Sequence, residues 1–146
     1  MRYFFILVLS LNFLYMNSQD NLPFYEISNY PESYSEAEIV GRMIDGLGFR
    51  YYWATEGLTE KDLNFRLPND SRSSIETVVH IYDLSNMILN TALNLPIEKK
   101  STEGMEFKEI REKTLFNLKE ASDIFKKTKN FDNHNIIFLR DSKKVE

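Results

Sequence analysis

Residues 71–95, SRSSIETVVHIYDLSNMILNTALNL, decide the fold of this chain. Ser73 followed by Glu76 is the signature of a capping box, in which each side chain binds a backbone amide at the start of a helix. Apolar residues then return to one helical face, and a second apolar series widens that face until little of the helix is left for water. We therefore predict a central helix packed against several neighbours. The two series are Ile75, Val78, Val79, Tyr82, Leu89, Leu93 and Ile81, Leu84, Ile88, Ala92, Leu95.

Two further helices are predicted on either side of this one. Ser35 and Glu38 form a second capping pattern before an apolar series that runs to about residue 56. A third amphipathic helix is predicted over about residues 105–127. We expect these three long helices to be antiparallel. The expected shared core consists of Leu47, Val78, Val79, Ile110 and Leu118.

Glycines and aromatic residues in the first helix need an explanation. Gly41, Gly46 and Gly48 each weaken a helix by up to about 1 kcal/mol relative to alanine, so we expect a neighbouring helix to approach closely there. The consecutive aromatics of residues 51–53 must spread over different faces of the helix. We interpret them mainly as core or boundary residues, with a ligand pocket as the alternative.

The first residues have the pattern of a secretory signal peptide. Arg2 precedes an apolar run over residues 3–16, and Ser18 is a small residue at a plausible cleavage point. The run is shorter than the roughly 20 residues of a membrane-spanning helix. We predict a signal peptide over 1–18, an extended linker over 19–34 and one helical domain over 35–146. The protein is expected to be exported, periplasmic or secreted, without membrane attachment after cleavage; an uncleaved N-terminal anchor is the alternative.

Composition argues against several functions. The 146 residues carry a net charge of −4 and contain no cysteine. Nucleic-acid binding needs a concentrated basic surface, and none is present. Without cysteine the chain has no disulfide, no thiolate nucleophile and no cysteine-based zinc site. A bound metal would have to rely on nitrogen and oxygen ligands.

The last residues are predicted to form part of a β-hairpin. Residues 136–139 are apolar and β-prone, residues 140–143 have the character of a turn, and Val145 begins a second strand. This hairpin is expected to be incomplete and to have an unpaired apolar edge.

The chain resembles the DinB-like four-helix proteins from about residue 34 to residue 146. The fold class that the resemblance implies is all-α, an antiparallel helical bundle of which three long helices and the partial hairpin are present here. The residues that carry the resemblance are Gly46-Leu47, 51–63, Phe65-Arg66, 71–75 and Val79-His80-Ile81-Tyr82.

The resemblance also implies a divalent metal site, with zinc or nickel as the candidates. In the family, one histidine on the second helix and two histidines a turn apart on the fourth hold the metal, and His80 matches the first. The other two have no counterpart, because the sequence ends before a fourth helix. His134 lies in a loop, and the metal role is not extended to it. We therefore expect this chain to hold no metal stably.

Two functions are compatible with the sequence. The first is an exported metal-dependent enzyme, a transferase or hydrolase as in the family, with an incomplete site. The second is a non-catalytic helical interaction module, or an inactive fragment, that binds a partner or forms a homodimer through the face a fourth helix would cover. A histidine on an apolar helix is also common as an ordinary core residue, which is the alternative interpretation of His80.

Overall fold

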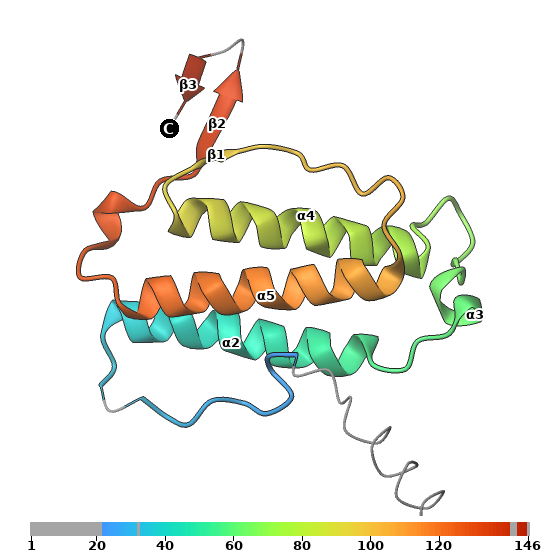
Figure 1. Ribbon diagram of the computed structural model, residues 1–146, viewed down its shortest axis with the longest axis horizontal. Helices are drawn as coiled ribbons and strands as arrows, with labels where there is room; N and C mark the ends of the chain where they lie inside the picture. Colours follow the sequence, from blue (N-terminus) through green and yellow to red (C-terminus); the bar gives the residue numbers. More distant parts are fainter. Residues whose placement is uncertain (1–21, 32, 141–142, 146) are drawn as a thin grey trace, which may run out of the picture.

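The structure is a computed structural model that describes residues 22–31, 33–140 and 143–145, with backbone only at 140 and 143–145. The predicted signal peptide lies outside the described residues. Within them the chain is mainly helical, as predicted, with a small sheet (Figure 1). The elements are α2 (Glu36–Thr55), α3 (Glu60–Leu63), α4 (Ser74–Ala92), β1 (Pro96–Ile97), α5 (Phe107–Lys126), the 3-10 turn η2 (Phe131–Asn133), β2 (Ile137–Arg140) and β3 (Lys143–Val145).

The predicted helix starts are confirmed. The Ser73 hydroxyl accepts a hydrogen bond from the Glu76 amide at 3.3 Å, and the Glu76 carboxylate accepts one from the Ser73 amide at 2.7 Å. Ser35 caps α2 by accepting from the Glu38 amide. These bonds satisfy amides that have no partner within the helix, which is why the short capping patterns mark α2 and α4 so well.

The helix in the middle is α5, so the prediction of a central helix at α4 is wrong. α2 and α4 each pack along α5 rather than against each other (Figure 1). Leu115 and Ala121 of α5 have no solvent-exposed surface, whereas Leu84 of α4 is 39% exposed. The broad apolar surface of α4 therefore reflects an incompletely covered helix and not a central one.

The directions of the helices also differ from the prediction. α2 runs antiparallel to α5, but α4 and α5 run in the same direction (Figure 1). Asn117 of α5 donates hydrogen bonds to Ser85 at 3.0 Å and to Asn86 at 3.1 Å, which sets the register of the parallel pair. The connection over residues 93–106 runs back along α4 so that α5 can start beside the start of α4. Amphipathic patterns specify a buried face but not a helix direction, so the sequence could not distinguish the two arrangements.

β1 was not predicted, and it changes the interpretation of the last residues. It pairs in parallel with β2, with Pro96 opposite Ile137 and Ile97 opposite Phe138, and β2 pairs antiparallel with β3. The predicted strand at 136–139 is confirmed within one residue. The hairpin was expected to leave an apolar edge unpaired. For one edge of β2 this prediction is wrong, because β1 pairs with that edge.

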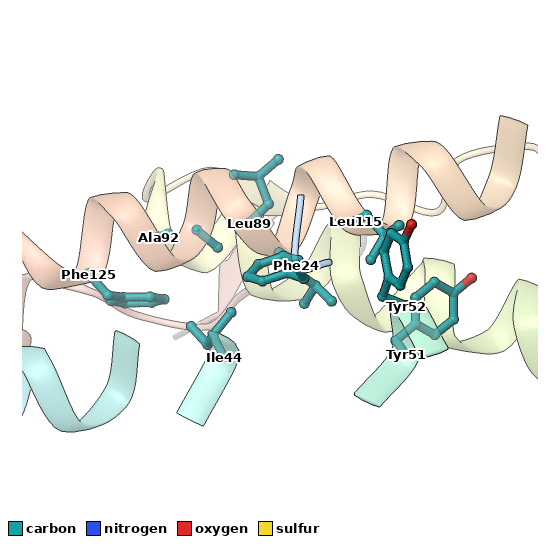
Figure 2. Packing of buried hydrophobic residues seen from close by; sticks show 10 residues of the cluster. Phe24, Ile44, Tyr51, Tyr52, Leu89, Ala92, Leu115 and Phe125 are labelled. Carbon is teal, nitrogen blue, oxygen red and sulfur yellow. The ribbon is translucent and has the colours of Figure 1, made fainter. Parts of the chain in front are cut away.

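Residues 22–31 form an N-terminal strap rather than a free linker. It contains no helix, its backbone turns at residues 23–26, and Phe24 is only 7% exposed and belongs to the main core (Figure 2). A Cβ atom on Gly48 would lie 2.5 Å from the Phe24 ring, so glycine makes room for this ring. The expected close helix approach holds for Gly41, whose missing Cβ leaves space for the Lys126 side chain of α5.

The predicted core residues are mostly buried, but they do not form one shared core. Val78, Ile110 and Leu118 are buried. Leu118 belongs to the main cluster, whereas Val78, Tyr82 and Ile110 form a separate one, the Val78 cluster, against which Val79 is half-buried. Tyr51 and Tyr52 are buried as expected. Leu47 is 42% exposed, so its assignment to the core is wrong.

Candidate functional site

An apolar groove runs between α2 and α4. Because both helices pack on α5, a space of about 510 Å³ remains between them, with Phe125 of α5 on its inner side. Figure 2 shows Phe125 and Ile44 next to each other at this end of the core. No lining residue is charged. The lining consists of Val40, Met43, Ile44, Leu47, Met87, Ile88, Thr91, Phe125 and Ile136.

The rim of the groove exposes large apolar side chains to solvent. Met43 is 70% exposed, Ile136 is 49% exposed and Leu47 is 42% exposed. Contact of apolar surface with water costs about 25 cal/mol for each Å². A contiguous patch of this kind is typical of a binding surface.

His134 supports the β-sheet end of the groove. Its Nε2 atom lies 2.8 Å from the Thr128 hydroxyl, and its Nδ1 atom lies 3.4 Å from the Thr91 carbonyl oxygen. The ring also packs edge-on against Phe125, with the ring centres 5.1 Å apart. Both ring nitrogens are thus engaged within the fold, which gives His134 a structural role beside the groove.

His80 lies on α4, half-buried, away from His134. Thr91, which His134 contacts, is eleven residues further along the same helix, a rise of about 16 Å at 1.5 Å per residue. The two histidines therefore lie at different ends of α4 and cannot bind one metal ion together.

The acidic neighbours of His80 do not complete a metal site. Both oxygens of Glu76 lie 2.8 Å from the Arg66 guanidinium, and one also caps the helix at Ser73. The hydrogen bond from the Ser73 amide and the contact with Arg66 lower the pKa of Glu76. Within the described part of the chain, no group of three or more histidine, cysteine, aspartate or glutamate side chains could hold a metal. These residues alone do not fit the three-ligand site that the resemblance implies.

A buried ionic cluster that sequence reasoning missed joins the strap, α2 and α5. Asp45 is 2% exposed, and its carboxylate accepts hydrogen bonds from Lys126 at 2.5 Å, Ser122 at 2.6 Å and Ser28 at 2.9 Å. Burial alone would raise the pKa of Asp45, but these hydrogen bonds outweigh it and hold the pKa below the ordinary value of an aspartate. Lys126 is 81 positions away in the sequence, so no local spacing could have indicated the pair.

Arg111 performs a similar structural role at the C-terminal end of α2. Its guanidinium donates to the Tyr52 carbonyl at 3.2 Å and to the Thr55 hydroxyl at 2.9 Å, and it pairs with Glu56 at 2.5 Å. It also lies 4.6 Å from the centre of the Tyr52 ring. A cation here satisfies the Tyr52 carbonyl and lies at the negative end of the helix, so we assign Arg111 to stability.

Comparisons with known protein families, curated proteins and solved structures gave no match. None of the helices among the described residues has the length and apolar character needed to cross a membrane.

Proposed function

We propose that this protein is a helical interaction module that binds an apolar helix in the groove between α2 and α4. The observation that carries the proposal is the uncharged groove itself, with Met43 mostly exposed at its rim. Helices bind in such grooves through apolar residues at positions i, i+3, i+4 and i+7. Two methionines in the lining, Met43 and Met87, suit this role because their flexible side chains adapt to a partner.

Binding can be tested with a synthetic alanine-rich helix that carries leucines at i, i+4 and i+7. Selectively labelled methionine methyl groups would report on it by NMR. We expect the peptide to shift the Met43 and Met87 signals and to leave Met105 unchanged, because Met105 packs against the separate Val78 cluster.

Matched variants separate groove binding from nonspecific hydrophobic contact. Leu47→Glu places a charge in the groove and should abolish the shifts, since burying an unpaired carboxylate is costly. Phe116→Glu changes a residue that is 48% exposed and does not line the groove, so binding should persist. Equal binding by both variants, or no shift in the unmodified protein, would contradict the proposal.

A second candidate is the exported metal-dependent transferase or hydrolase implied by the DinB-like resemblance. One observation favours it: His80 lies seven residues, or about two helical turns, before Met87 and therefore on the same side of α4 as the groove. A bound helix carrying two histidines one turn apart could then supply the ligands that this chain lacks.

Calorimetry can test this candidate with the leucine helix redesigned to contain His-x-x-x-His. We expect Zn²⁺ to bind the protein–peptide mixture at least about tenfold more tightly than the peptide alone, because a third ligand is added. His80→Ala should remove the gain. If the variant retains it, His80 is not a metal ligand.

A further inference from the structure

The outer side of α2 carries a stripe of residues that is symmetric about Met43. Ile39 and Leu47 lie four positions before and after Met43, and Glu36 and Arg50 lie seven positions before and after it. Spacings of four and seven residues return to one side of a helix, so the stripe is continuous. All five residues are exposed. In order, it presents an acid, three apolar side chains and a base.

We infer that the helix which occupies the groove region is α2 of a second copy of this chain. The two α2 helices would pack antiparallel about a two-fold axis beside Met43. This inference rests on the proposed function and names its partner. Two-fold symmetry requires one surface to complement itself. Antiparallel pairing satisfies this, because Met43 then meets the same residue of the other copy, and Ile39 meets the other copy's Leu47.

The charges at the ends of the stripe select this direction. In the antiparallel arrangement, Glu36 of each copy lies opposite Arg50 of the other, which forms the same ion pair twice. A parallel arrangement would place Glu36 against Glu36 and Arg50 against Arg50, and like charges repel. One Arg50 nitrogen donates to the Gly46 carbonyl at 3.0 Å, and a guanidinium has further donors for a carboxylate.

The apolar part of the stripe is continuous with the groove. Met43 and Leu47 belong to both, so a second copy placed on the stripe also covers the α2 wall of the groove. Residues four apart form a ridge that packs into the grooves of a facing helix. The groove lining contains no charged side chain, so a second copy that covers it places no like charges directly against one another there.

Reciprocal charge reversal tests the register. Sedimentation equilibrium of the full chain should show a monomer–dimer equilibrium at low salt. Glu36→Arg alone and Arg50→Glu alone should each weaken the dimer about tenfold, because each replaces two attractive pairs with two repulsive ones. The double reversal restores both pairs and leaves the net charge unchanged, so it should recover the original affinity.

Two other variants test the apolar centre. Met43→Glu brings two carboxylates together at the axis and should abolish the dimer, whereas Phe116→Glu should not. Residues 43 and 116 are exposed, so both variants should keep the helical circular dichroism of the unmodified chain and, at concentrations where that chain is monomeric, its melting temperature.

The outcomes distinguish this inference from the proposed function. A chain that stays monomeric, or a double reversal that fails to recover the affinity lost by the single ones, overturns the antiparallel dimer. If the leucine helix still shifts Met43 and Met87 in that case, the interaction module stands with a different partner. If neither association nor peptide binding occurs, both are wrong.

Discussion

Lys126→Met is expected to lower the free energy of unfolding by about 3–5 kcal/mol, because it leaves the carboxylate of Asp45 buried without its cation. Asp45 is 2% exposed and would retain only the hydroxyl groups of Ser28 and Ser122 as partners. Urea unfolding followed by circular dichroism measures the change. The matched control is Lys119→Met, which removes a pair with Asp123 on the solvent side of α5. An exposed pair of this kind contributes at most about 1 kcal/mol, so equal losses in the two variants would contradict the role assigned to Asp45.

The pH dependence of this difference follows from the lowered pKa of Asp45. A carboxyl group with a lower pKa in the folded state stabilises the fold above its unfolded-state pKa, which is about 3.9. That stabilisation is lost as the pH falls through the folded-state pKa. We therefore expect the gap between the unmodified chain and Lys126→Met to be largest near neutral pH and to shrink below about pH 4. A gap that does not change with pH would mean that ionised Asp45 is not its source.

Leu115→Ala is expected to lower the free energy of unfolding by about 2–5 kcal/mol, because it leaves a cavity in the middle helix. Leu115 has no exposed surface and belongs to the cluster that α2, α4 and α5 share (Figure 2). The neighbouring residue provides the control: Phe116→Ala removes more atoms, but from a half-exposed side chain. If Phe116→Ala proves the more destabilising in urea unfolding, then α5 does not face its neighbours as described.

The parts of the fold that the sequence predicted well are those set by local interactions. Ser35 and Ser73 cap their helices through residues only three positions away, and the apolar periods of α2, α4 and α5 are contained within each helix. Such features need no knowledge of what lies across the core, which is why the bounds of these helices could be predicted to within a few residues.

The predictions that proved wrong concern contacts between residues that are far apart in the sequence. Leu47 fits a core pattern, but no helix among the described residues covers it, and α5 rather than α4 became the middle helix. Phe24 sits in a stretch without helical period, and only the missing side chain of Gly48 gives it a buried position. β1 begins at Pro96, a residue that local reasoning assigns to the end of a helix.

The groove could not be predicted from local sequence, because its lining comes from separate elements, α2, α4 and α5, and from Ile136. The uncovered face expected from the family resemblance stays a prediction, and His80 could be placed on α4 but not given partners. Glu76 lies one helical turn before His80, but capping Ser73 and pairing with Arg66 occupy its carboxylate. The spacing of the α2 stripe residues is visible in the sequence. Their use as a contact surface could be inferred only from the structure, which shows that Met43 is exposed.

The most direct test of the proposed docking surface is a dilution series followed through the methionine methyl signals of the full chain. Association through the α2 stripe should shift Met43 as the chain concentration rises and leave Met105 unchanged, since Met43 lies on the stripe and Met105 lies away from the groove. If Met43 and Met87 remain unchanged on concentration and on addition of the leucine helix, the groove is not a docking surface.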